Sequence, residues 1–456
     1  MYLAEKFARY AVEEVSFNRI PDKLLEEVKR RVVDSFGVMM GAYNATPPRI
    51  SRQVAALGRS DKYGATLFGS THKTTVDYAS FANGCHVRYL DFNDTYLSKE
   101  ALHPSDMIPA IIAVAEAEGA DGKKVVEGIV AAYEIVGRLA DAASIRARGW
   151  DHVTYIAIAT AVGVGKVMDL DVEKMTQAIN LATTPNVALR QTRAGEISMW
   201  KGCAAANAAR NGVFAALLAK HGMTGPSPVF EGEMGFFKQV SGEFTVEKFG
   251  GVNDEYKLFE TSIKYHPVEY HAMSAVDAAL KLRERMGGFN IEDVERIDVE
   301  TFTVSYVIIV KDPEKWDPKT RETADHSLPY IISVALIDGK VWLDSFAPER
   351  VLAEDVRKVM KKMTVRVNPE FDEVYPKGIP NKITITLKNG ETLSEQVTYP
   401  RGHFMNPMTN EEIEEKFNKL GSKYMADEKR RIALDMLWNL EKQSDMAEIM
   451  KAFTRE

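Results

Sequence analysis

The apolar positions in the first 264 residues recur every three to four residues, which is the spacing of amphipathic helices. Segment 22–42 follows Pro21 and carries one continuous apolar stripe, so it is predicted to be a helix. The same pattern returns in four later segments: 107–119, 123–143, 172–182 and 203–221. Glycine and alanine are frequent in these segments, which favours close packing of one helix on another. This part of the chain is predicted to be helical throughout.

A different pattern begins after about residue 264. Apolar and polar residues alternate, as in half-buried strands, in segments 294–304, 382–387 and 393–399, while 353–361 has helical spacing. The last two strand segments flank Asn389-Gly390, which is a strong signal for a hairpin turn. This region is therefore predicted to be a compact α+β domain.

The chain ends in helical patterns that begin at Thr409 and Glu412, whose spacing is that of a capping box. We expect these helices to return to the first domain. The predicted fold is thus mainly α. It has a large all-helical domain, 1–265 joined by 405–456, and a smaller α+β domain, 266–404, inserted before the C-terminal helices.

Composition limits the possible functions. The 456 residues, 45% of them hydrophobic, are enough for two domains with large cores. The net charge of −7 argues against a nucleic-acid surface, so an anionic substrate would need a local cationic pocket. No apolar run of 18 residues occurs, and the first residues do not resemble a signal peptide. We expect a cytoplasmic protein without a membrane partner.

Several cofactor chemistries lack their sequence signals. Cys85 and Cys203 are the only cysteines, too few for a disulfide framework or for an ordinary iron–sulfur cluster. Segment 163–166 lacks the spacing and the hydroxyl residue of a phosphate loop, and no zinc or serine-hydrolase motif occurs. We therefore expect neither a cofactor nor a bound metal.

The densest group of polar residues lies between positions 88 and 106. If 85–95 is helical, Arg88, Asp91 and Thr95 share one face. His103 can exchange a proton near neutral pH, and a carboxylate such as Asp91 can orient it. An elimination reaction needs such a set of groups. A helix end with solvated charges would explain the same spacing.

Two further groups of residues are candidates. Arg193 and Lys201 lie in a loop before an alanine-rich helix, where guanidinium and ammonium groups could bind carboxylates. Lys264 and His271 lie at the domain transition, which suits a cleft. A surface loop would also explain the arginine, and a salt-bridge network between the domains would explain the second group.

His152 and Tyr330 are additional candidates, although a single histidine is more often structural than catalytic. His152 follows Trp150-Asp151, and Tyr330 closes the segment Asp325-His326-Ser327-Leu-Pro. Each precedes or opens an apolar helical segment.

Together and in this order, these groups resemble the MmgE/PrpD family over nearly the whole chain. The most specific stretches are 88–95 with 103–106, 189–201 and 325–330. The resemblance implies a cofactor-independent hydro-lyase that dehydrates 2-methylcitrate to 2-methyl-cis-aconitate in propionate catabolism, with citrate as a second candidate substrate. It also implies a homodimer. Decarboxylation of cis-aconitate or epimerisation, by the same fold, and a non-catalytic helical interaction protein remain alternatives.

The resemblance also implies which residues form the site. The family's pocket positions correspond to Asp91, Thr95, His103, His152, Lys201 and Lys264, with Tyr330 nearby. We expect His103 and His152 to transfer protons, with His103 oriented by Asp91, and Lys201 and Lys264 to stabilise charge. Substrate contacts are expected from Arg88, Thr95, Arg193, His271 and Tyr330. The segment Gly202-Cys203-Ala204 departs from the usual family pattern, which leaves the exact substrate open.

Overall fold

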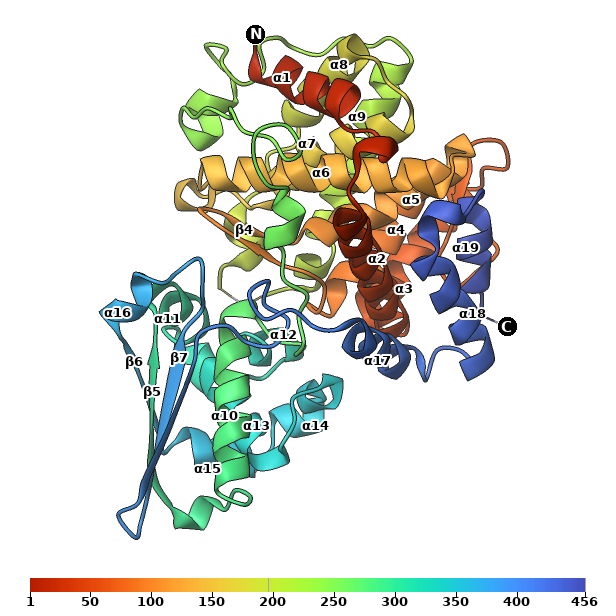
Figure 1. Cartoon of the computed structure of the whole chain (residues 1–456). Coiled ribbons are helices and arrows are strands. Elements are labelled where there is room, and N and C mark those ends of the chain that lie inside the picture. The colour runs from red at the N-terminus through yellow and green to blue at the C-terminus, as the bar shows by residue number, and fades with distance from the viewer. Residues whose placement is uncertain (196, 456) are drawn as a thin grey trace. The chain divides into compact units, whose positions relative to one another are not determined.

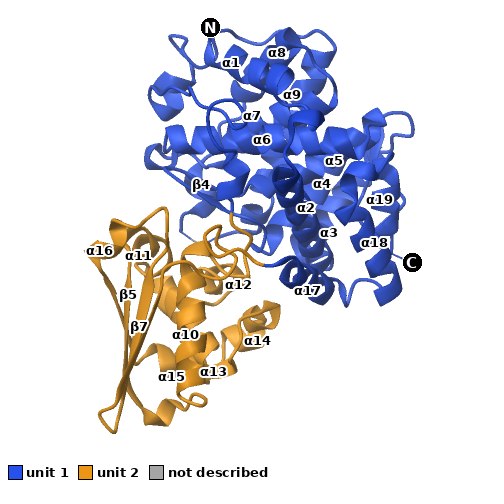
Figure 2. Ribbon diagram, in the orientation of Figure 1, with its two compact units in different colours: residues 1–261, 409–456 blue, residues 262–408 orange. Residues whose placement is uncertain are grey.

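A computed structural model of the protein describes residues 1–195 and 197–455 (Figure 1). The chain forms two compact units, the larger from 1–261 with 409–456 and the smaller from 262–408 (Figure 2). The protein is mainly α, as predicted. The first junction lies at 261 rather than 265, so Lys264 belongs to the smaller unit.

The larger unit is built almost entirely of helices. They are α1 (Leu3–Arg9), α2 (Asp22–Ala42), α3 (Thr46–Ala55), α4 (Val76–Tyr89), α5 (Ile108–Glu118), α6 (Gly122–Ala142), α7 (Val153–Val167), α8 (Val172–Thr183), α9 (Ala204–Lys220), α17 (Asn410–Gly421), α18 (Asp427–Trp438) and α19 (Met446–Ala452). The five helices that periodicity predicted in this unit are confirmed, each end within one residue of its expected place.

Helix α6 runs through the middle of the larger unit and packs on α7, whose residues are all buried (Figure 1). A Cβ atom at Gly128 of α6 would lie 2.8 Å from the carbonyl oxygen of Gly163 of α7. A Cβ atom at Gly163 would in turn lie 2.8 Å from the carbonyl oxygen of Gly128. The two glycines therefore allow a backbone approach that larger residues would prevent.

The C-terminal helices belong to the larger unit, where α17 packs on α2. Thr409 accepts a hydrogen bond from the backbone N–H of Glu412, and Glu412 accepts one from the backbone N–H of Thr409. The predicted capping box is therefore confirmed. Because each partner satisfies an N–H that the first turn leaves open, the pair fixes where α17 begins.

Replacing Thr409 by alanine is expected to lower the free energy of unfolding by about 1 kcal/mol, since a backbone N–H loses its acceptor. Chemical denaturation of the full chain measures this. Thr409→Ser keeps the hydroxyl and should be close to wild type. Equal losses in both variants would contradict the capping role.

The larger unit also contains two short antiparallel hairpins that the sequence did not predict. One pairs β1 (Gly64–Thr66) with β2 (Lys73–Thr75), and the other pairs β3 (Tyr96–Leu97) with β4 (Ala101–Leu102). The assumption of a helix over 85–95 was wrong, because α4 ends at Tyr89. Asp91 has a φ of 52°, a left-handed conformation in which an α-helix cannot continue.

The smaller unit is a four-stranded sheet covered by helices. Its strands are β5 (Val294–Thr301), β6 (Met363–Val367), β7 (Asn381–Leu387) and β8 (Thr392–Val397), in the order β6-β5-β7-β8. Its helices are α10 (Met273–Arg285), α11 (Thr303–Ile309), α12 (Arg321–Ala324), α13 (Leu328–Asp338), α14 (Pro348–Val351), α15 (Glu354–Met360) and α16 (Pro369–Asp372). The predicted α+β character and the β7–β8 hairpin are confirmed.

Strand β6 was not predicted. It pairs parallel to β5, whereas β7 pairs antiparallel to β5 on its other side. Helix α10 packs on β7 and β8. None of the helices formed by residues 1–195 and 197–455 has the length and apolar character that a membrane crossing requires.

Candidate active site

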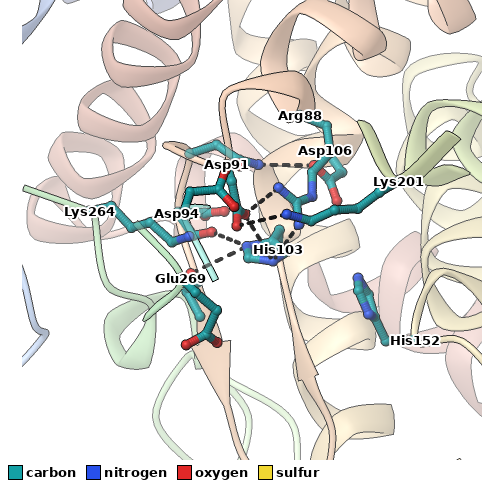
Figure 3. A network of polar contacts seen from close by, with 12 residues as sticks. Arg88, Asp91, Asp94, His103, Asp106, His152, Lys201, Lys264 and Glu269 are labelled. Atoms are coloured by element: carbon teal, nitrogen blue, oxygen red, sulfur yellow. Dashed lines mark hydrogen bonds and ion pairs between the residues drawn. The ribbon is translucent and has the colours of Figure 1, made fainter. Parts of the chain in front are cut away.

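The β3–β4 hairpin explains how His103 comes to lie beside residues that precede it by nearly ten positions. Tyr96 pairs with Leu102 in this hairpin, so continuing the register places His103 opposite Thr95. The Thr95 Oγ1 atom lies 3.3 Å from Nδ1 of His103. Helix α4, the hairpin and the following 3₁₀ turn (Pro104–Met107) thus bring the first group of candidates together (Figure 3).

The neighbours of His103 define which of its nitrogens carries a hydrogen. Its Nδ1 lies 2.7 Å from the backbone carbonyl oxygen of Asp94, which can only accept, so Nδ1 is the donor. Its Nε2 lies 3.1 Å from Nη2 of Arg88, which can only donate. In the neutral form of the His103 ring, the hydrogen therefore lies on Nδ1 and the lone pair on Nε2. The carbonyl of Asp94 holds the Nδ1 side of the ring, and Oδ1 of Asp91 lies 4.0 Å from Nε2.

Asp91 lies between two cations. Its carboxylate forms an ion pair with Arg88, three residues earlier, and its Oδ2 accepts a hydrogen bond from Nζ of Lys201 at 3.4 Å. Lys201 lies in the 3₁₀ turn Met199–Gly202 that precedes α9, and all three side chains are buried. One carboxylate thus faces two cationic groups, which leaves this cluster with a net positive charge suited to an anionic ligand.

Asp94 anchors the segment that carries His103. Its Oδ1 accepts hydrogen bonds from the backbone N–H and the hydroxyl of Ser105, at 2.9 and 2.7 Å. Its Oδ2 accepts one from the hydroxyl of Tyr133, on α6, at 2.8 Å. Burial raises the pKa of Asp94 although these donors oppose it. Because α6 is a central helix, the network ties the position of His103 to the core.

His152 forms a second group with Asp151 and Arg193. Nδ1 of His152 lies 3.0 Å from Oδ1 of Asp151, and Nε of Arg193 donates to the same oxygen at 3.1 Å. Burial and the Arg193 charge lower the pKa of His152 to about 4, although Asp151 opposes them. The rings of His152 and His103 lie 5.8 Å apart, centroid to centroid. The larger unit therefore brings together both predicted histidines.

The smaller unit holds the remaining predicted residues. Lys264 is fully buried and donates from Nζ to the carbonyl oxygen of Val268 at 3.0 Å. Nδ1 of His271 lies 2.7 Å from Oε1 of Glu269. Burial alone would raise the pKa of Glu269, but His271, His326 and Lys264 together lower it to about 2. Lys264 and His271 thus belong to one charged group within this unit.

Tyr330 forms a hydrogen bond within the smaller unit. Its side chain is fully buried at the start of α13, and its hydroxyl donates to the carbonyl oxygen of Ser345 at 2.6 Å. Ser327, in the same motif, caps this helix. The hydroxyl of Tyr330 therefore holds the helix to the following segment, and a contact between Tyr330 and the substrate stays a prediction.

Family models match almost the whole chain. Residues 5–248 match the MmgE/PrpD N-terminal domain, and residues 266–441 match the MmgE/PrpD C-terminal domain.

The chain belongs to the MmgE/PrpD family.

Curated relatives agree with this assignment. The mitochondrial 2-methylcitrate dehydratase of Yarrowia lipolytica is 32% identical over 363 residues, which cover 75% of this chain and 69% of that protein. The 2-methylcitrate dehydratase of Salmonella typhimurium is 30% identical, over 75% of this chain and 74% of that protein. An alkylcitrate dehydratase of a fungal species is 28% identical, over 78% of this chain and 75% of that protein. By name, these relatives are carbon–oxygen lyases.

The site of this MmgE/PrpD protein also contains residues that the sequence did not single out. Asp94, Asp106 and Asp151 are buried carboxyl groups in direct contact with the predicted residues or their segment. Asp94 and Asp106 lie in the dense polar group between positions 88 and 106. The sequence does not show that they are buried, and burial is what distinguishes them from solvated charges. Among the described residues, no group of three or more histidine, cysteine or acidic side chains is arranged to hold a metal ion.

Asp106 is a buried carboxyl group with a raised pKa. Burial raises its pKa to about 7; Asp94 adds to this, while Arg88 and Asn93 oppose it. Its Oδ1 accepts a hydrogen bond from Nδ2 of Asn93 at 2.9 Å, and its Oδ2 has no partner among the residues that the structure describes. Asp106 is therefore protonated at mildly acidic pH in the protein without ligand.

Replacing Asp106 by asparagine is expected to make the protein more stable relative to wild type as the pH rises. In the unfolded chain the pKa of an aspartate is about 3.9, so between this value and 7 only the folded wild type holds the proton. Stability from this group is fully present below pH 3.9 and is lost by about pH 7. Between pH 5 and pH 8 the difference in unfolding free energy should move by about 2 kcal/mol in favour of Asp106→Asn.

Denaturation at the two pH values measures this shift. Asp171→Asn, at an exposed helix cap, is the control and should show no comparable pH dependence. A stability difference between Asp106→Asn and wild type that does not change with pH would contradict a proton on Asp106.

Proposed function

We propose that this protein is a hydro-lyase that dehydrates 2-methylcitrate to 2-methyl-cis-aconitate, with citrate as a possible second substrate. The names of the relatives support the reaction class. The proposal extends to a role in propionate catabolism and to a cytoplasmic homodimer that needs no cofactor.

One observation carries the proposal. Two imidazole rings, those of His103 and His152, lie 5.8 Å apart beside cationic side chains. The buried Arg88 and Lys201 and the partly buried Arg193 supply the cations, in a chain whose overall charge is negative. Proton carriers beside cations are what elimination from a polycarboxylate requires, because a proton must leave a carbon next to a carboxylate.

The reaction needs one proton acceptor and one proton donor. The acceptor removes the proton from C3 of 2-methylcitrate, and the electron pair of that C–H bond forms the C2–C3 double bond. The C2–OH bond breaks, and the departing hydroxyl takes a proton and leaves as water. No electrons are exchanged with another molecule. Proton acceptors, proton donors and cations, which this chain supplies, are therefore the types of group that the reaction needs.

The difficult part of this reaction is the charge that develops on the carboxylate next to C3. A general base typically contributes about 10²- to 10⁴-fold, which is too little for so weakly acidic a proton. Fixed cations close to the developing charge must supply the larger share, and they act most strongly in a buried site. In this proposal Lys201 and Arg193 take this role in the larger unit, and Arg88 and Thr95 contact the substrate.

In the same proposal the smaller unit contributes Lys264 as a further cation and His271 as a substrate ligand. His271 has its Nδ1 engaged by Glu269, and its buried Nε2 has no partner among the described residues. A buried imidazole nitrogen of this kind can bind a polar ligand group without first giving up a protein contact.

Product analysis tests the reaction type. The purified chain is offered 2-methylcitrate, citrate and cis-aconitate in separate reactions, and the products are identified by mass spectrometry. We expect 2-methylcitrate to lose one water. Release of carbon dioxide from cis-aconitate without any dehydration would replace the proposal by a decarboxylase, and racemisation without loss of mass would replace it by an epimerase. No reaction would favour an interaction protein.

A further inference from the structure

Asp151 contacts two of the proposed site residues with a single oxygen atom. Its Oδ1 lies 3.0 Å from Nδ1 of His152 and accepts a hydrogen bond from Nε of Arg193 at 3.1 Å. Burial alone would raise the pKa of Asp151, but Arg193 and His152 hold it well below its usual range. Asp151 therefore remains charged because of these two neighbours, and its completely buried side chain has a fixed position.

The backbone around Asp151 is held in place independently of the side chains. Its N–H donates to the carbonyl oxygen of Ala188 at 2.8 Å, and the N–H of Arg190 donates to the carbonyl oxygen of Gly149 at 3.0 Å. These bonds join the segment before α7 to the segment that leads to Arg193. The distance from Asp151 to Arg193 is therefore set by the fold.

The carboxylate of Asp151 also decides the tautomer of His152. A carboxylate can only accept, so the hydrogen of the neutral ring lies on Nδ1 and the lone pair on Nε2. Nε2 is buried and has no hydrogen-bond partner in the part of the chain that the structure describes. In His103, by contrast, the Nε2 lone pair already accepts a hydrogen bond from Arg88. His152 thus has the more available lone pair.

Arg193 has a buried terminal nitrogen that could bind a ligand. Its Nε is engaged by Asp151, whereas Nη2 is buried without a partner among the described residues. A guanidinium group binds a carboxylate readily through its terminal nitrogens. A carboxylate on Nη2 would be close enough to offset the charge of Arg193 as His152 experiences it.

We propose that Asp151 is a positioning residue that presents His152 as the base, and that binding of a substrate carboxylate to Arg193 raises the basicity of His152. This inference rests on the proposed function for the identity of the substrate as a polycarboxylate. His152 then removes the C3 proton only when substrate is present. The proton for the departing hydroxyl then comes from His103 in its imidazolium form, whose second N–H lies on Nε2, 4.0 Å from the Asp91 carboxylate.

The charges around His152 agree with this role. Arg193 and Arg88 disfavour its protonated form, Asp151 favours it, and the ring of His103 lies 5.8 Å away, centroid to centroid. Without a ligand the imidazole is neutral near pH 7, as a base must be at rest. A carboxylate bound to Arg193 would weaken the repulsion between Arg193 and protonated His152, which is larger than that from Arg88. The attraction between Asp151 and protonated His152 would remain.

Nitrogen NMR of the histidine side chains tests the inference directly, because it reports both the tautomer and the titration of each ring. The full chain is labelled with ¹⁵N-histidine, and the His152 signals are assigned with His152→Gln. The probe is propane-1,2,3-tricarboxylate, which has no hydroxyl group and cannot react. Calorimetry measures whether the probe binds.

We expect the hydrogen of His152 on Nδ1 in the free protein, and an apparent pKa that moves upward by at least one unit when the probe binds. In Asp151→Asn the preference for Nδ1 should be lost, and turnover of 2-methylcitrate should fall by about 10²-fold, mainly in kcat. In Arg193→Met the probe should no longer move the titration of His152. Asp171→Asn, at an exposed helix cap, should match wild type in all of these measurements.

A hydrogen on Nε2 of His152 in the wild type, or a titration that the bound probe leaves unchanged, would overturn the inference. A protein that shows the expected tautomer and binds the probe with the expected shift, but does not dehydrate 2-methylcitrate, would contradict the proposed function alone. Failure of the probe to bind would overturn the proposal that a carboxylate on Arg193 raises the basicity of His152. The role of Asp151 would then be decided by whether His152 loses its preference for a hydrogen on Nδ1 in Asp151→Asn.

Discussion

Replacing His103 by glutamine is expected to lower kcat for dehydration of 2-methylcitrate by about 10²- to 10⁴-fold, the usual contribution of a positioned proton carrier. Glutamine is polar and of similar reach, so it can still contact Arg88 and the carbonyl of Asp94 on either side of the ring position. It cannot exchange a proton near neutral pH. The loss should therefore appear in kcat, with the melting temperature nearly unchanged.

Steady-state kinetics and thermal unfolding of the same preparation measure the two effects. His221→Gln, at the exposed end of α9, is the matched control and should retain full activity. A His103→Gln protein that keeps more than about a tenth of wild-type kcat would contradict proton transfer by His103. A melting temperature that falls with kcat would point to a structural role.

Replacing Lys201 by methionine is expected to lower kcat/KM by about 10²- to 10³-fold, which is the cost of removing one group that stabilises developing charge in a buried site. Methionine keeps most of the volume of the lysine side chain but not its charge. Asp91 retains its ion pair with Arg88, so the carboxylate is not left without a partner. The cluster loses one positive charge, and the transition state loses more than the bound substrate does.

The balance between kcat and KM separates catalysis from simple binding. A fall mainly in kcat supports charge stabilisation in the transition state, whereas a rise in KM alone would show uniform binding and contradict this role. Lys174→Met, at an exposed position of α8, is the control. Lys201→Arg should recover only part of the activity, because a guanidinium group does not reproduce a compact ammonium charge.

The helices could be predicted from the sequence because their information is local. Segment 22–42 has its own apolar stripe and its own start signal, and α2 occupies the same residues. The β7–β8 hairpin has a local turn signal, Asn389-Gly390, and Thr409 and Glu412 carry their capping contact within four residues. The regular elements of both units therefore follow from short stretches of sequence.

The geometry of the site could not be predicted, because it depends on contacts between distant segments. The contact between Tyr133 and Asp94 joins residues 39 positions apart, and that between Arg193 and Asp151 joins residues 42 positions apart. Neither has a periodic signal. The expected helix over 85–95 does not form, because Asp91 has a left-handed conformation. Asp91 nevertheless forms an ion pair with Arg88. The two residues were thus correctly expected to be close, but not because they share a helix.

The central claim is that the groups of this chain remove water from 2-methylcitrate, and a single time course tests it. Purified protein is treated with a metal chelator and mixed with 2-methylcitrate, and the absorbance of a conjugated unsaturated acid is followed. We predict that absorbance rises to the same final value that is reached from 2-methyl-cis-aconitate, and that His103→Gln slows this approach by about 10²-fold or more. No absorbance change with folded wild-type protein would contradict the account.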